Sequence, residues 1–155
     1  MFIGTIFLIT ILPFLLFYVL KAWSLYRLAN GRYENAWLAW IPIGHEYLMS
    51  EMLHQYMNLG FSYYTPHAFW VMLVVIIAEA VLGSVPVLGV LSLIVLLYAR
   101  FCFYRDFYYL YDKKNFTIFG VLSAIIPFSS IIMNFVVAKY PAIDDRDFRG
   151  MKEIF

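Results

Sequence analysis

The sequence predicts an all-α integral membrane protein with three transmembrane helices and two proline-broken helical segments that re-enter the membrane or lie at its interface. Of the 155 residues, 64% are hydrophobic and only 14% are charged, and a soluble domain of this size could not bury so much apolar surface. Three apolar segments are suited to cross a bilayer, and two others carry the same Ile-Pro interruption. Residues 1–155 are therefore expected to form one membrane domain, with residues 140–155 as a charged cytoplasmic tail.

The first span is expected at about residues 3–21. Residues 2–20 form an uncharged run of 19, close to the roughly 20 residues that cross the hydrocarbon layer. No basic segment precedes this run and no small-residue cleavage site follows it, so it is interpreted as a retained helix rather than a signal peptide.

The second and third spans are expected at 67–83 and 87–104, joined by the uncharged turn sequence GSVP. Aromatic and basic residues follow the third span and also precede the first proline break, a pattern typical of a lipid headgroup layer. The residues expected to act as interface anchors are Trp37, Trp40, Arg100, Tyr104, Arg105 and Tyr108.

The first broken segment reads WLAWIPIGHEYLM, residues 37–49. Pro42 removes a helical hydrogen bond and Gly44 permits a turn, so the chain is expected to reverse or flatten there. Polar residues from His45 to Asn58 fall largely on one face, which predicts an amphipathic helix that lies along the surface or lines a groove.

The second broken segment, residues 118–139, contains Pro127. A shift of the chain by 85 residues aligns Ile41-Pro42 with Ile126-Pro127 and gives four further identities. This predicts a pseudo-repeat with halves at about 1–60 and 86–140, each a membrane helix, a collar, a loop and a broken helix.

Charge placement favours a re-entrant path for both broken segments. If both return to the face from which they enter, all 11 basic residues lie on one side, as expected for the cytoplasmic side. The N-terminus is then outside and the C-terminus cytoplasmic. The second segment is also long enough to span, which would place the tail outside.

The residues Trp37, Ala39, Ile41-Pro42-Ile43 and Tyr47 give the chain a resemblance to small multipass bacterial membrane proteins of uncharacterised function, some of them associated with signal peptidases. Those proteins carry a Trp-x-Ala-x-Ile-Pro-Ile-x-x-x-Tyr signature, whereas Gly44 and His45 depart from the residues usual after Ile-Pro-Ile. The resemblance implies a bacterial inner-membrane location and no particular activity.

A metal site is one hypothesis for the first broken segment. Glu51 and His54 have the i, i+3 spacing that directs a carboxylate and an imidazole to one metal, and His45 is a further candidate ligand. The aligned positions of the second half hold Val136 and Lys139, so a solvated polar face is the competing interpretation. No other cofactor is expected.

Glu79 is the one acidic residue well inside an expected span. An intramembrane carboxylate is costly, which favours a proton, ion or partner role. The alternative is that Glu79 reaches the outer interface beside the GSVP turn.

Two classes of function follow. The lack of a catalytic set or of a basic run for nucleic acid favours a non-enzymatic subunit, scaffold or assembly factor, whose partners are lipid and other membrane proteins or further copies of itself. The alternative is a small homo-oligomeric transporter or channel that uses the broken helices and Glu79.

Overall fold

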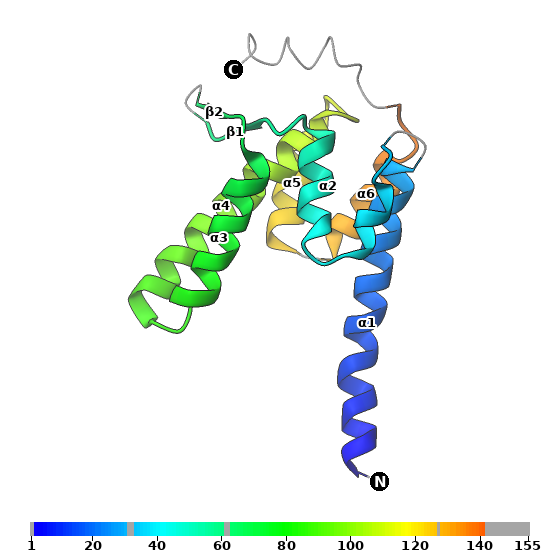
Figure 1. The fold of residues 1–155 in the computed structure, drawn as a ribbon, viewed down its shortest axis with the longest axis vertical. Helices are drawn as coiled ribbons and strands as arrows, with labels where there is room; N and C mark the ends of the chain where they lie inside the picture. The colour runs from blue at the N-terminus through cyan, green and yellow to red at the C-terminus, as the bar shows by residue number, and fades with distance from the viewer. Residues whose placement is uncertain (1, 31–32, 61–62, 127, 142–155) are drawn as a thin grey trace.

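The computed structural model describes residues 2–30, 33–60, 63–126 and 128–141, with side chains from residue 11 onward. These residues form six α-helices, a 3₁₀ helix and two short strands (Figure 1). The elements are, in order, α1 (Phe2–Ala29), η1 (Ala36–Trp40), α2 (Gly44–Met52), β1 (Met57–Asn58), β2 (Tyr64–Thr65), α3 (Ala68–Leu82), α4 (Pro86–Tyr109), α5 (Phe116–Ile125) and α6 (Ser129–Val137). The predicted helical class is confirmed.

Among the residues whose side chains the structure describes, two helices are long and apolar enough to cross a membrane. They are α4 and the part of α1 from Ile11 to Ala29, and both extend beyond the predicted ends at residues 21 and 104. The reason is packing: Leu25 on α1 and Phe107 on α4 lie past those limits and are buried in the core. The apolar helices α3 and α5 are shorter, with 15 and 10 residues.

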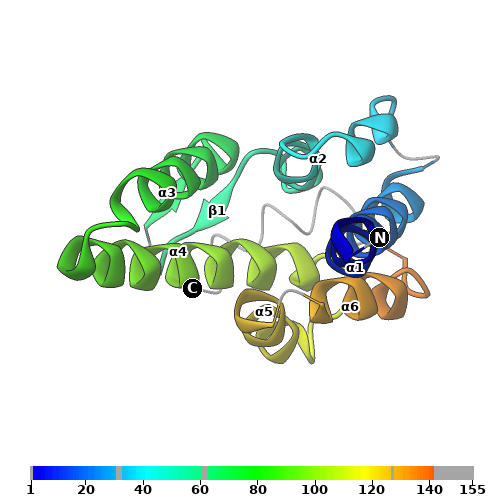
Figure 2. The ribbon, with the colours of Figure 1, turned by 90° about the horizontal axis from the view of Figure 1, so that it is seen from below.

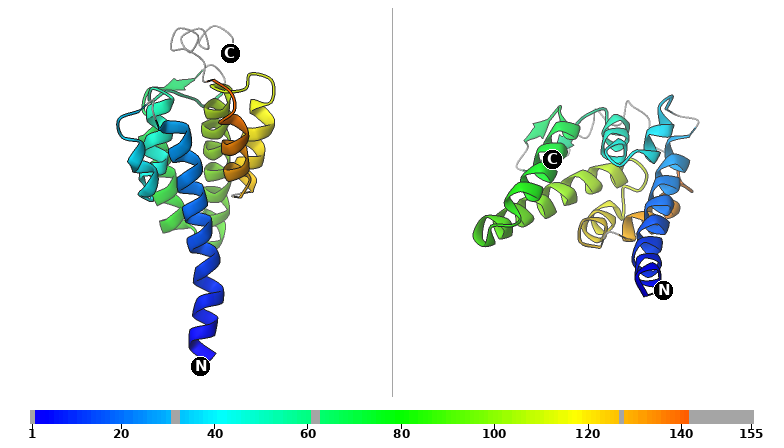
Figure 3. Two further views of the ribbon diagram at one scale, coloured as in Figure 1. Left: turned by 90° about the vertical axis from the view of Figure 1, so that its right-hand side faces the viewer. Right: turned by 60° about the horizontal axis from the view of Figure 1, so that its bottom comes forward.

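The predicted hairpin at GSVP is present between α3 and α4. Pro86 occupies the first turn of α4, where its missing N–H costs no hydrogen bond. Gly89 allows the two helices to meet closely, because a Cβ there would lie 2.6 Å from the Gly83 carbonyl oxygen. The hairpin points away from α1, so the lower parts of the two diverge (Figure 1 and Figure 3).

Both broken segments reverse the chain direction at their Ile-Pro sequence. Ile41 (φ −103°, ψ 133°) and Ile126 (φ −111°, ψ 102°) are both extended, as expected for a residue before proline, whereas Pro127 itself lies outside the described residues. After each break the chain turns back toward the end of the molecule from which it came, through α2 in the first segment and obliquely through α6 in the second (Figure 1).

The two broken segments also match in their boundaries. η1 ends at Trp40 and α5 at Ile125, while α2 covers residues 44–52 and α6 covers 129–137, so these three boundaries each differ by 85 residues, whereas the starts of η1 (Ala36) and α5 (Phe116) differ by 80. Viewed along α1, the two segments lie on different sides of that helix (Figure 2).

The predicted amphipathic helix from His45 to Asn58 is wrong in its second half. The helix ends at Met52, and His54 (φ 50°) and Gln55 (φ 63°) adopt the left-handed conformation. The N–H of Gln55 donates to the Ser50 carbonyl and that of His54 to the Glu51 carbonyl, which is the Schellman termination motif. The following residues form the antiparallel pair β1–β2.

The core gathers around the C-terminal half of α4. Phe103, Phe107 and Tyr108 are fully buried there, with Leu25 of α1 and Leu48 of α2. The N-terminal half of α4 is instead largely exposed. One half of the molecule is therefore closely packed, and the other presents apolar side chains outward.

Candidate functional site

A buried polar network joins four helices beneath the basic end of the molecule. The Ser123 hydroxyl on α5 donates to the Tyr108 hydroxyl (3.0 Å), which donates to Asn134 Oδ1 on α6 (3.2 Å). Asn134 Nδ2 donates to Ser24 Oγ on α1 (3.1 Å), and Ser24 donates to the Lys21 carbonyl (2.8 Å). Each of these four hydroxyl or amide groups thus has partners within the network, which suits a place that water does not reach.

A second polar junction connects α4 to β1. Asp106 Oδ2 accepts a hydrogen bond from the Asn58 N–H (2.6 Å), and Arg105 Nη2 donates to the Asn58 carbonyl (2.7 Å). Arg105 and Asp106 are also bonded to each other, at 2.8 Å. The Arg105–Asp106 pair thus forms hydrogen bonds with both the N–H and the carbonyl of Asn58, as the backbone of a neighbouring strand would.

The first helix break is held against α1. Tyr18 on α1 donates to the carbonyl of Trp40, the last residue of η1. The second break reaches the neighbouring position of the same helix, where Phe17 and Phe128 pack edge to face with centroids 4.4 Å apart. Both chain reversals therefore lie at one level along α1.

Gly44 is required at the first break because of space. A Cβ on this residue would lie 2.1 Å from the Leu38 carbonyl oxygen. The requirement arises from a close backbone approach across the reversal and not from an unusual backbone angle. The second break has Ser129 in the corresponding position, and Ser129 Oγ donates to the Ile126 carbonyl (2.7 Å).

His45 follows Gly44 and is only 3% exposed. Its Nδ1 lies 3.2 Å from the Pro42 carbonyl, while Nε2 has no hydrogen-bond partner in the structure. Burial lowers the pKa of His45 to about 4, and the nearby Lys21 charge acts in the same direction. The imidazole is therefore neutral at physiological pH.

The candidate metal ligands are not brought together. The Glu51 carboxylate accepts a hydrogen bond from Gln55 (2.8 Å), and His54 is exposed in the turn after α2, away from the buried His45. Among the described residues, no group of three or more His, Cys, Asp or Glu side chains is placed to hold a metal ion. The i, i+3 pattern failed here because the helix ends between Glu51 and His54.

Glu79 lies partly buried in the seam between α3 and α4. Its Oε2 accepts a hydrogen bond from Ser92 Oγ (2.6 Å), and Ser92 also donates to the Gly89 carbonyl (3.0 Å). Glu79 is one turn before the loop between the two helices, and that loop ends well short of the N-terminus of α1 along the long axis (Figure 1).

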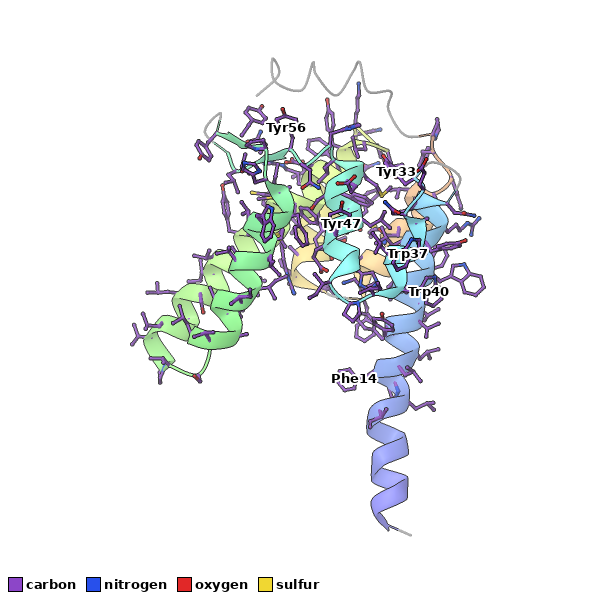
Figure 4. The ribbon with its side chains drawn as sticks, viewed as in Figure 1. Phe14, Tyr33, Trp37, Trp40, Tyr47 and Tyr56 are labelled. Atoms are coloured by element: carbon purple, nitrogen blue, oxygen red, sulfur yellow. The ribbon has the colours of Figure 1, made fainter. Side chains whose placement is uncertain are left out.

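The predicted interface anchors divide into two groups. Trp37 and Trp40 are exposed (Figure 4), and Arg100 and Tyr104 are partly exposed. Tyr108 is fully buried, so its assignment as an interface anchor is wrong. Arg105 is engaged within the molecule by Asp106 and Asn58.

The network centred on Tyr108 was not predicted from the sequence. Its members are far apart in sequence, since Asn134 and Ser24 are separated by 110 residues. The available signal was the presence of Ser123 and Asn134 in an apolar segment, because polar groups buried among apolar helices need partners.

No protein-family model matches this chain, and no curated protein or solved structure is significantly similar to it.

Proposed function

We propose that this chain is a non-enzymatic integral membrane protein that acts as a subunit, scaffold or assembly factor of a larger membrane complex. The observation that supports this best is the free lower part of α1. All six side chains from Ile11 to Leu16 are apolar and exposed. Phe14 is 72% exposed and projects on the side of the α3–α4 hairpin (Figure 4). Exposed apolar side chains of this kind suit contact with a helix of another subunit.

The use of the polar side chains supports the same proposal. The buried hydroxyl and amide groups of Tyr108, Ser123 and Asn134 are hydrogen-bonded to one another. The side chains of Arg105 and Asp106 are hydrogen-bonded to the backbone of Asn58. Polar groups that serve as internal connections are not available to line a substrate path. The remaining outer surface is mainly apolar, which suits packing against lipid and other membrane helices.

The proposed topology has three spans, α1, α3 and α4, in the bacterial inner membrane. The broken segments η1–α2 and α5–α6 enter and leave on the cytoplasmic side, where the C-terminus also lies. The depth of the breaks supports this: from Ala29 to Tyr18 the helix rises about 17 Å, roughly half of a 30 Å hydrocarbon layer. The short helix α3 would be accommodated by local thinning of the bilayer.

A re-entrant segment needs protein contacts for its non-helical backbone. The Trp40 carbonyl meets this need through Tyr18, and Phe128 packs on Phe17. We also propose that the matching boundaries of the two broken segments reflect an internal pseudo-repeat, in which α1 and α4 are the corresponding long helices.

The experiment that tests the proposed function is native mass spectrometry of the protein extracted gently from its host. A stoichiometric second membrane protein is expected. A homo-oligomer without a partner would overturn the subunit proposal in favour of transport. The Glu79→Gln variant, whose amide oxygen still accepts from Ser92, separates the two further: loss of flux with intact assembly would identify a transporter.

A further inference from the structure

The basic end of the molecule contains a small polar pocket between the C-terminal ends of α1 and α6. The pocket has a volume of about 120 Å³ and is lined by Arg27, Leu28, Asn30, Tyr111, Ala138 and Tyr140. The side chains of Arg27, Asn30 and Tyr140 offer hydrogen-bond donors to a ligand in this space.

Arg27 is exposed and lies over the Phe135 ring of α6, with its guanidinium carbon 6.0 Å from the ring centroid. Within the described part of the chain, no carboxylate is paired with it. Lys139, also exposed, follows α6 at the same end. Arg27 thus lines the pocket, Lys139 stands in sequence between the lining residues Ala138 and Tyr140, and no acid among the described residues is paired with either cation.

Apolar stripes lead away from both cations. On α1, Leu16, Leu20 and Trp23 precede Arg27 at spacings of three and four residues, and all three are exposed. On α6, Phe128 and Ile132 are exposed and precede Phe135 and Lys139 in the same way.

The two stripes run in the same direction. α1 and α6 pack against each other through Phe17 and Phe128 and through Ser24 and Asn134, and both end at the basic face (Figure 1 and Figure 3). A cationic, donor-rich pocket therefore lies at the end of two exposed apolar stripes on neighbouring helices.

We propose that this pocket binds the phosphate of an anionic phospholipid, whose acyl chains lie along the α1 and α6 stripes. Arg27 and Lys139 neutralise the headgroup, and the Asn30 amide and the Tyr140 hydroxyl donate to its oxygens. Guanidinium and ammonium groups at the cytoplasmic surface are the usual partners of anionic headgroups. A free phosphate shares the headgroup chemistry but makes no use of the apolar stripes.

The test measures binding of phosphatidylglycerol to the delipidated, detergent-solubilised full chain by native mass spectrometry, with phosphatidylcholine, a zwitterionic lipid of zero net charge, as the reference. We expect the Arg27→Gln/Lys139→Gln variant to bind phosphatidylglycerol more weakly, by about fivefold for each cation removed. The matched control, Lys113→Gln/Lys114→Gln, removes the same charge from the loop between α4 and α5 and should bind as the unmodified chain does.

Three results would overturn the proposal. The first is equal binding by the Arg27→Gln/Lys139→Gln variant and the unmodified chain, and the second is an equal loss in the control variant, which would mean a general surface charge effect. The third comes from thermal unfolding of the unmodified chain. If inorganic phosphate alone raises the unfolding temperature as much as phosphatidylglycerol does, the ligand is free phosphate. None of these results depends on whether a protein partner exists.

Discussion

Tyr108 on α4 and Asn134 on α6 share a hydrogen bond of 3.2 Å between the phenol oxygen and Oδ1, and both side chains are buried. This bond is the central connection of a chain that extends to Ser123 on α5 and Ser24 on α1. Apolar contacts between helices in lipid give little direction to their packing, so such polar connections help fix which faces meet.

Replacing Tyr108 with Phe should therefore destabilise the protein by about 1–2 kcal/mol, because the hydroxyl of Ser123 and Oδ1 of Asn134 each lose a buried partner. Thermal unfolding in detergent, followed by circular dichroism, measures the effect. Tyr63→Phe is the control, since Tyr63 is 64% exposed. Equal unfolding temperatures for the two variants would contradict a stabilising role for the network.

Gly44→Ala should destabilise the first broken segment by about 1–3 kcal/mol, because the new methyl group meets the Leu38 carbonyl at 2.1 Å. The corresponding position of the second break already accommodates a side chain, that of Ser129. Ser129→Ala is thus a matched control and should cost less, about 1 kcal/mol for its hydrogen bond to Ile126. The prediction fails if Ser129→Ala proves the more damaging change in the same unfolding assay.

His45 should make the protein less stable in acid. Folding lowers the pKa of His45 from 6.5 to about 4, so between these pH values the unfolded chain binds a proton that the folded chain does not. Its contribution to stability is therefore full above pH 6.5 and is lost as the pH falls toward 4.

The measurement is the free energy of unfolding across that range, for the unmodified chain and for His45→Gln. The variant should have a smaller slope than the unmodified chain. Identical slopes for the unmodified chain and His45→Gln would show that this imidazole does not titrate differently on folding.

The parts of the fold that follow from local chemistry were predictable from sequence. Pro42 followed by Gly44 predicts that the chain reverses or flattens, the turn residues at 83–86 predict a hairpin, and the structure contains a reversal and a hairpin at these positions. The end of α2 was not predictable, because the left-handed position is filled by His54 rather than glycine. Because no glycine marks the end of the helix, the helical spacing of polar residues predicts a helix that continues past Met52, where α2 ends.

The candidate site was less predictable, for a physical reason. A tyrosine near the end of an apolar helix is equally consistent with a headgroup belt and with a buried hydrogen bond, and only helix packing decides between them. For Tyr108 the partners come from α5 and α6, whose position against α4 depends on a close approach at Gly120. Sequence periodicity does not contain this information.

The proposed topology makes a final prediction that separates a re-entrant α5–α6 segment from a spanning one. In a Cys102→Ser background, single cysteines at positions 84, 113 and 139 report the loops after α3, after α4 and after α6. If α5 and α6 return to the face from which they enter, a membrane-impermeant maleimide added to intact cells labels Ser84→Cys alone. The other two variants should react only after the cells are permeabilised. Labelling of Lys139→Cys together with Ser84→Cys would mean that the segment crosses the membrane, and would place the C-terminus outside.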